Sequence, residues 1–313
     1  MSPVAAIDCG TNSIRMLIAE AGADGRPVDV SRRLELVRLG QGVDATRRFH
    51  PDALERTFAA IDSFAADLES ADVSRLRFVA TSAARDATNR DEFFAGVRSR
   101  LGVEAEIITG DEEARLSYAG AVAGVGQVPE PLLVMDIGGG STELVVGRAG
   151  EITSAVSLDI GSVRLRERVL PSDPTPEVER RAATEIIDAA LDGSGTDFAS
   201  VRTWVGVAGT ATSMAAVQLG LTEYDRAAVH RSVITNAQVH DLADRFLTAP
   251  VASLLDLPTL PQRRAEVIGA GSLIASRIAS RLTGADTATG RGVDMIVSES
   301  DILDGIVGDL LSR

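Results

Sequence analysis

The sequence predicts an α/β protein built from two similar halves that face a common cleft. A strand, a glycine turn and a second strand open the chain, and the same arrangement returns in its middle. After each copy, apolar residues alternate between the spacing of strands and the spacing of helices, which is typical of sheets covered by helices. We therefore expect a duplicated fold.

The first half should begin with three strands, because apolar residues dominate Val4–Asp8, Ile14–Ala19 and Leu34–Leu39. Apolar residues three and four positions apart then predict a helix over Asp52–Leu68. Strands and helices alternate in the rest of this half, with strands at Leu76–Ala80 and Glu104–Ile108 and helices at Asp91–Leu101 and Glu112–Ala123.

The second half should begin after a loop that ends at Pro131. Its expected strands are Leu132–Asp136, Thr142–Gly147, Ile152–Leu158 and Arg202–Val207, and its expected helices are Glu177–Leu191, Ser213–Leu219 and Pro261–Leu282. A final helix, Ser300–Leu311, should cross back to the first half. The expected domains are thus residues 1–124, joined by 300–313, and residues 125–299.

Composition excludes several classes of protein. A chain of 313 residues with 45% apolar content can form two cores. Its net charge of -14 argues against binding nucleic acid or anionic membranes. The single cysteine, Cys9, fits a packing role in a reducing compartment, and with no leader or membrane span in evidence we expect a cytoplasmic protein. All 31 basic residues are arginines, so a lysine-containing Walker A loop is absent.

Two glycine turns are candidate phosphate sites. The segments Asp8-Cys-Gly-Thr-Asn-Ser13 and Asp136-Ile-Gly-Gly-Gly-Ser141 share an aspartate, a glycine and a serine between strands. Glycine lets phosphate oxygens approach the backbone N–H groups of such a turn. Either copy alone is equally well explained as an ordinary hairpin, but two matching copies favour binding. The candidate residues are Gly10, Thr11, Asn12, Ser13, Gly138, Gly139, Gly140 and Ser141.

A third glycine turn, Gly206–Thr212, lies between a predicted strand and a predicted helix. Unpaired N–H groups and the helix dipole favour an anion at such a junction. Gly209 and Thr210 are therefore candidates too. The alternative is plain packing of a strand against a helix.

Five charged residues are candidates for chemistry beside these turns. Asp136 and Glu143 flank the second turn and Asp8 precedes the first, where carboxylates suit Mg²⁺. Thr109 and Glu112 have the spacing of a capping box, which leaves the next residue, Glu113, as a candidate general base. The alternative for Glu113 is a solvated glutamate in a first helical turn. Arg85, after a buried strand, can clamp a phosphate with two N–H groups.

Together these segments resemble the exopolyphosphatase and guanosine pentaphosphate phosphatase family. The matching segments are Asp8-x-Gly-Thr-Asn-Ser-x-Arg15, Thr81–Arg85, Ile108–Leu116, Asp136–Glu143 and Gly206–Thr212, in the family's order. The resemblance implies the two-domain actin, Hsp70 and sugar-kinase fold, with duplicated βββαβαβα halves of the ribonuclease H-like type. The chain ends without a histidine-rich C-terminal domain, so it resembles the short form of the family.

The resemblance also implies an activity: release of terminal orthophosphate from inorganic polyphosphate. In that activity Glu113 is the base, Asp136 and Glu143 organise Mg²⁺ or Mn²⁺, and Arg85 contacts the phosphate chain. A homodimer is expected from the same resemblance.

The sequence is compatible with three alternative functions. One is hydrolysis of the 5′ gamma-phosphate of pppGpp, which needs a guanosine pocket that the sequence does not reveal. Another is a kinase of the same superfamily, against which Glu113 in its Glu-Glu-Ala-Arg setting argues. The third is a sensor that binds pppGpp or ppGpp without turnover, against which the retained carboxylates argue.

Overall fold

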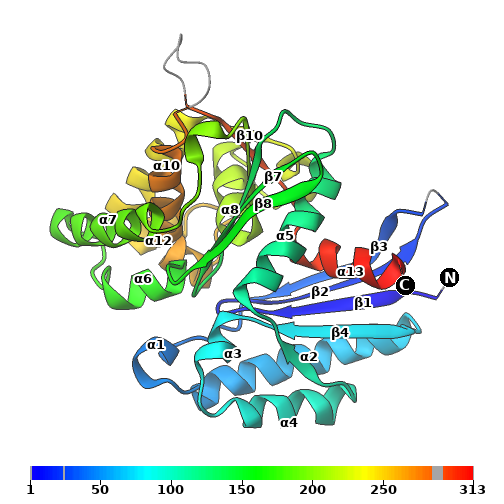
Figure 1. Ribbon diagram of the computed structural model, residues 1–313. Coiled ribbons are helices and arrows are strands. Elements are labelled where there is room, and N and C mark those ends of the chain that lie inside the picture. Colours follow the sequence, from blue (N-terminus) through cyan, green and yellow to red (C-terminus); the bar gives the residue numbers. More distant parts are fainter. Residues whose placement is uncertain (1, 24, 284–291, 313) are drawn as a thin grey trace. The chain divides into compact units, whose positions relative to one another are not determined.

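The computed structural model describes residues 2–23, 25–283 and 292–312, and the chain divides into two compact units (Figure 1). Unit 1 consists of Met1–Gly120 and Asp301–Arg313, and unit 2 consists of Ala121–Ser300. The described residues of each unit form one sheet with helices packed on it. The predicted α/β class is confirmed.

The described residues of unit 1 form a five-stranded sheet in the order β3-β2-β1-β4-β5. The first three strands are antiparallel, whereas β4 and β5 run parallel to β1. The strands are β1 (Val4–Cys9), β2 (Ile14–Ala21), β3 (Pro27–Glu35), β4 (Arg75–Ala80) and β5 (Ala105–Ile107). Parallel neighbours require crossover connections, and helices supply them.

Helices cover both faces of this sheet (Figure 1). Helices α2 and α4 pack on one face, and α13 packs against β1 and β2 on the other. The helices of unit 1 are α1 (Val43–Thr46), α2 (Pro51–Ser70), α3 (Ser82–Asp86), α4 (Arg90–Leu101), most of α5 (Gly110–Val125) and α13 (Ile302–Ser312). The end of the described chain thus completes the core of the unit that the beginning of the chain forms.

Two glycines let α5 and α13 approach closely. A Cβ atom on Gly120 would lie 1.8 Å from the carbonyl oxygen of Asp301, and one on Gly305 would lie 2.1 Å from the carbonyl oxygen of Leu116. No side chain fits at those distances. The contact between the two helices therefore depends on glycine at both positions.

Unit 2 repeats the topology of unit 1. Its sheet has the order β10-β11-β9-β6-β7-β8, so β8, β7, β6, β9 and β11 correspond to β3, β2, β1, β4 and β5, and β10 is an addition at the edge. The strands are β6 (Leu132–Ile137), β7 (Thr142–Arg148), β8 (Glu151–Leu158), β9 (Thr203–Val207), β10 (Val233–Ile234) and β11 (Met295–Val297). The predicted duplication is confirmed in the strand order.

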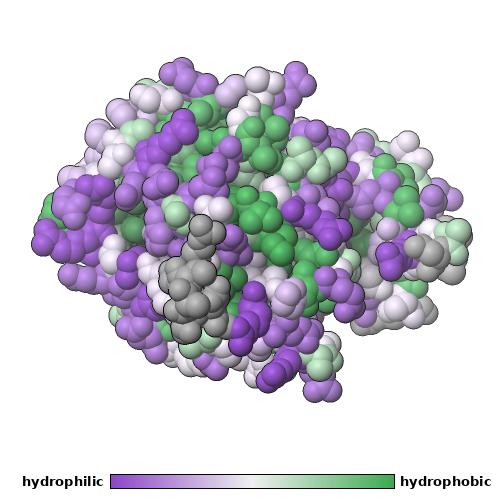
Figure 2. Space-filling model, turned by 90° about the horizontal axis from the view of Figure 1, so that it is seen from above, coloured by the Kyte–Doolittle hydropathy of each residue, from purple (hydrophilic) through white to green (hydrophobic). Residues whose placement is uncertain are grey.

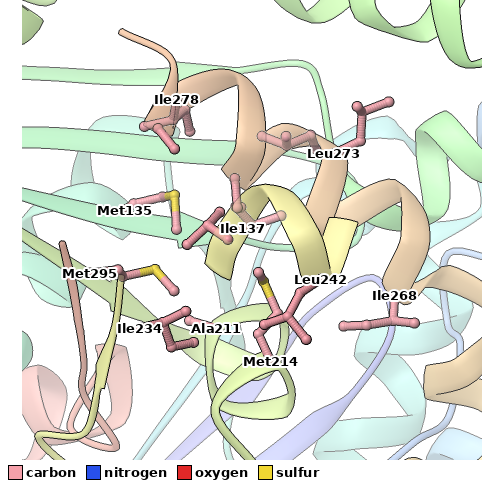
Figure 3. Packing of buried hydrophobic residues seen from close by; sticks show 14 of the residues in the cluster. Met135, Ile137, Ala211, Met214, Ile234, Leu242, Ile268, Leu273, Ile278 and Met295 are labelled. Atoms are coloured by element: carbon pink, nitrogen blue, oxygen red, sulfur yellow. The ribbon is translucent and has the colours of Figure 1, made fainter. Parts of the chain in front are cut away.

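The core of unit 2 lies between its sheet and its helices. Met135 and Ile137 of β6 face Met214 of α8, while Leu242 and Ile268 approach from two further helices (Figure 3). The helices are α6 (Ser162–Arg168), α7 (Glu177–Asp192), α8 (Ala208–Gln218), α9 (Arg226–Val229), α10 (Asn236–Thr248), α11 (Val251–Leu254), α12 (Gln262–Ala279) and a short 3-10 turn (Phe198–Ser200).

The predicted third strand was misplaced. Leu34–Leu39 was expected to be extended, but β3 ends at Glu35 and Arg38 has a φ of 52°. A strand cannot continue through that conformation. Val37 and Leu39 are still buried, because the segment that follows β3 packs into the core of unit 1.

The surface is mainly hydrophilic on the face shown in Figure 2. None of the helices in the described ranges combines the length and the apolar character that a membrane crossing needs. Cys9 is buried as expected, and burial raises the pKa of its thiol well above the ordinary value.

Candidate active site

The two predicted glycine turns have the same geometry. The N–H of Gly10 donates to the carbonyl oxygen of Ser13 at 2.9 Å, and the N–H of Gly138 donates to that of Ser141 at 3.0 Å. The next three N–H groups of each turn, at residues 11–13 and 139–141, have no acceptor among the described residues. Because unpaired buried N–H groups are costly, such a turn is suited to hold an anion.

The first turn is held by its neighbours in unit 1. The Thr11 hydroxyl shares a hydrogen bond of 2.9 Å with that of Ser82 at the start of α3. The N–H groups of Arg38 and Gly40 donate to the carbonyl oxygens of Asn12 and Thr11. Asn12 is only 4% exposed, yet neither atom of its amide group bonds to a described residue. Its side chain is therefore available to a ligand.

The second turn is held by the start of α6. The N–H groups of Ser162 and Val163 donate to the carbonyl oxygens of Gly138 and Gly139, both at 2.9 Å. Arg164, which is 7% exposed, donates through Nε to the carbonyl oxygen of Gly140 at 2.7 Å. These bonds use the carbonyl side of the turn and leave its N–H groups to a ligand.

The third turn differs from the prediction. Helix α8 begins at Ala208, five residues before the expected start, so Gly209 and Thr210 belong to its first turn. Ala208 makes the sharp exit from β9 with a φ of 59°. The Thr210 hydroxyl donates to the carbonyl oxygen of Ile137, which ties this helix start to the end of β6. The second and third turns are therefore neighbours in unit 2.

Two buried arginines beside these turns were missed from the sequence. Arg264 of α12 is 8% exposed, and a Cβ atom on Gly209 would lie 2.1 Å from its Nη2. A cation against the positive end of a helix is unfavourable unless an anion joins them. Arg164 binds the carbonyl side of the second turn. The only sequence signal for either is an arginine on the buried face of a helix.

Asp8 and Arg15 form a buried ion pair at the first turn. Arg15 donates to Asp8 Oδ2 from Nη2 at 2.6 Å and from Nε at 3.2 Å. Asp8 Oδ1 is buried and bonds to no described residue. Burial raises the pKa of Asp8, an effect that Arg15 opposes. One oxygen of this carboxylate thus remains available to a metal, a water or a substrate.

Asp136 and Glu143 lie directly opposite each other in the β6–β7 ladder. Opposed side chains lie on the same face of a sheet. Both are buried, at 7% and 1% exposure, and Glu143 Oε1 accepts a bond of 2.7 Å from the Ser157 hydroxyl. Two carboxylates on one face fit Mg²⁺, which takes one or two from a protein and completes its shell with water and phosphate oxygens.

Arg85 and Glu113 are paired in unit 1. Arg85 Nη1 donates to Glu113 Oε2 and to the carbonyl oxygen of Ile108, both at 2.9 Å. The Thr109 hydroxyl accepts from the N–H of Glu112 as a helix cap, but the Glu112 carboxylate bonds to Arg77 at 2.6 Å instead of closing a capping box. The neighbouring glutamates therefore have separate partners.

The structure thus distributes the predicted residues between the two units. Unit 1 carries the first turn with Asp8, Arg85 and Glu113, and unit 2 carries the other two turns with Asp136 and Glu143. Within the described ranges, no three potential ligands among histidine, cysteine, aspartate and glutamate form a ready metal cluster. Any metal held here therefore needs substrate or water oxygens as well.

The chain is similar to known proteins along nearly its whole length. Residues 17–292 match the model of the Ppx/GppA phosphatase family. The chain is 45% identical to Exopolyphosphatase 2 of Mycobacterium tuberculosis, over 98% of each chain. A crystal structure of an exopolyphosphatase-like protein superposes with a TM-score of 0.93 at 41% identity, covering 99% of this chain and 97% of that one. The Aquifex aeolicus Ppx/GppA family member gives 0.81 at 31% identity, covering 99% and 98%. With its duplicated sheets and matching glycine turns, this chain belongs to the Ppx/GppA phosphatase family.

Proposed function

We propose that this protein is an exopolyphosphatase, which releases the terminal orthophosphate of inorganic polyphosphate by attack of water. The observation that carries the proposal is the pair of equivalent turns, each with three consecutive N–H groups that lack acceptors among the described residues. A chain of phosphates offers regularly spaced anionic oxygens to such groups. The 45% identity to a mycobacterial exopolyphosphatase supports the same substrate.

Glu113 acts as the general base. Its carboxylate accepts a proton from the water that attacks the terminal phosphorus, and the bond from Arg85 fixes its direction. The Nε and Nη2 atoms of Arg85 bond to no described residue, so this edge of the guanidinium can hold two phosphate oxygens while Nη1 holds the base. Positioning and charge stabilisation are the main requirements of phosphoryl transfer.

We expect unit 2 to supply the groups that stabilise the leaving phosphate. The second turn and the start of α8 offer N–H groups, and Arg264 adds a positive charge beside Gly209. In unit 2, Asp136 and Glu143 would hold Mg²⁺ or Mn²⁺. In unit 1, Asp8 would offer an oxygen ligand to a divalent ion. When bound, the ion supplies positive charge to the phosphate oxygens.

The proposal also includes the oligomeric state of the protein and its cellular compartment. We expect a homodimer in the cytoplasm, without nucleic acid among its partners. Light scattering of the purified protein tests the dimer, and fractionation of cells tests the compartment.

The deciding experiment measures orthophosphate release with Mg²⁺ from defined-length polyphosphates and from pppGpp. Glu113→Gln should abolish release from polyphosphate, while the control Glu112→Gln, whose partner is Arg77, should keep it. Release from pppGpp alone would move the assignment to the alarmone phosphatase. Transfer to an acceptor would make the protein a kinase, and tight pppGpp binding without release would make it a sensor.

A further inference from the structure

We propose that Asp301, at the start of α13, is a positioning residue that holds Asp8 in its working orientation through Arg15. The inference rests on the proposed role of Asp8 as an oxygen ligand of a divalent ion. It concerns how the C-terminal helix of unit 1 contributes to that site.

The contacts form a continuous chain of charges. Arg15 uses one edge of its guanidinium, Nε and Nη2, for Asp8 Oδ2, and its remaining amino group, Nη1, donates to Asp301 Oδ2. Asp301 thereby fixes the rotation of the guanidinium, and the guanidinium fixes which oxygen of Asp8 it binds. Asp8 Oδ1 is left directed away from Arg15, buried and without a described partner.

Burial strengthens the restraint that these three charged side chains place on one another. Asp8 and Asp301 are 5% and 4% exposed, and the Arg15 side chain is 14% exposed. A buried charge that loses its partner is costly, so each member of the chain restrains the others. Without Asp301, Nη1 loses this acceptor and the guanidinium can shift to bind both oxygens of Asp8, which would occupy Oδ1.

Asp301 also caps α13, and an experiment must separate this capping role from its bond to Arg15. Its Oδ1 accepts from the N–H of Leu303 at 3.1 Å and so caps α13, whereas its Oδ2 binds Arg15. Asparagine caps a helix as well as aspartate does, but it carries no charge for the guanidinium. Asp301→Asn therefore removes the ion pair and keeps the cap.

The same helix offers a matched control. Asp304 also lies at the start of α13, is also largely shielded, and pairs with Arg32 of β3 at 2.7 Å. It makes no contact with Arg15 or Asp8 in the described structure. Its Oδ2 accepts from the N–H of Asp301 at 3.0 Å, a bond that an asparagine oxygen can keep. Asp304→Asn thus removes an equal charge from the same helix and leaves the side-chain contacts of Arg15 and Asp8 in place.

The experiment titrates Mn²⁺ into the full-length protein and follows free Mn²⁺ by electron paramagnetic resonance, without substrate. We expect Asp301→Asn to weaken Mn²⁺ binding about 10-fold, as is usual when a residue that orients a metal ligand is lost. Asp304→Asn should bind like the wild type. In an Asp8→Asn background, Asp301→Asn should have no further effect, because its influence passes through Asp8.

Urea unfolding of each variant shows whether weaker Mn²⁺ binding comes from a loss of folding stability or from a misplaced Asp8. If Asp301→Asn does not fold, Asp301→Glu, which keeps the charge on a longer arm, takes its place and should weaken binding less than 10-fold. Equal Mn²⁺ affinity in the wild type and the folded Asp301 variant, or equal weakening in the Asp304 control, overturns the proposal. Because the readout is ion binding, a negative result here is distinct from a failure to hydrolyse polyphosphate.

Discussion

Arg85 Nη1 donates to Glu113 Oε2 at 2.9 Å and to the carbonyl oxygen of Ile108 at the same distance. The arginine therefore joins the end of one strand region to the first turn of α5. It leaves its Nε–Nη2 edge without a described partner. One guanidinium can thus direct the proposed base and bind the phosphate that the base's water attacks.

Replacement of Arg85 by lysine should impair both tasks. An ammonium group cannot bond to a carboxylate and to two phosphate oxygens with fixed geometry, so we expect kcat to fall about 100-fold and KM for polyphosphate to rise. Steady-state release of orthophosphate measures both. Arg77→Lys, which changes the arginine paired with Glu112, should stay near the wild type. An unchanged kcat would show that Arg85 does not orient the base.

Ser157→Ala should change the requirement for metal. The Ser157 hydroxyl donates to Glu143 Oε1 at 2.7 Å, and loss of that bond removes one restraint on the direction of the carboxylate. We expect the Mg²⁺ concentration for half-maximal activity to rise about 10-fold, with activity largely restored at high Mg²⁺. Ser154→Ala, on the same strand but opposite Val146, is the control. A loss that high Mg²⁺ does not reverse would contradict a role for Glu143 in metal binding.

Gly305→Ala should destabilise unit 1, since the new methyl group would meet the carbonyl oxygen of Leu116. Overpacking of a close helix contact should lower the free energy of unfolding by about 2 kcal/mol. Gly308→Ala lies on the same helix with open space around its Cβ position, and it should raise that free energy by about 0.5 kcal/mol through helix propensity. Urea denaturation compares the two. Equal effects would refute the close packing of α5 on α13.

Asp188→Asn should reduce stability only where Asp188 is ionised. Although partial burial acts in the opposite direction, hydrogen bonds from Arg277 and Arg281 lower the pKa of Asp188 below its ordinary value of 3.8. This contribution is complete above that value and is lost as the pH falls through the lower pKa of the folded protein. We expect a deficit of about 1 kcal/mol at pH 7 that shrinks as the pH falls below 3.8. Thermal unfolding at several pH values tests it, and a deficit that persists in acid would point to packing instead.

Much of the fold was accessible from the sequence because the periodicity of apolar residues is strong where strands are buried. β1, β6 and β9 are buried along their whole length and were placed within two residues at each end. The third strand failed because Val37 and Leu39 are buried outside the sheet, and periodicity does not tell a strand from a loop that packs into the core. The start of α8 failed because its first residues are small and uncharged.

Part of the candidate site could also be predicted from the sequence, because some of its residues follow a local pattern. Glycine turns can be recognised because backbone geometry limits the residues they accept, and the common hydrogen bond of Gly10 and Gly138 follows from that geometry. Arginines that come from distant segments, such as Arg264 on α12, leave no comparable pattern. Their place depends on how helices pack, which local sequence does not encode. The roles of Glu113, Asp136 and Glu143 stay predictions.

The position of α13 has a consequence for the order in which the protein matures on the ribosome. One side of the β1–β2 sheet is covered by Ile302, Leu303, Ile306 and Val307, which are synthesised after the whole of unit 2. The N-terminal segment of unit 1 therefore keeps an apolar face of its sheet uncovered until synthesis ends. Unit 2, whose residues are continuous in sequence, can complete its folding earlier. During that interval the nascent chain presents a surface suited to a chaperone, and ribosome stalling before residue 301 should leave the first unit sensitive to protease.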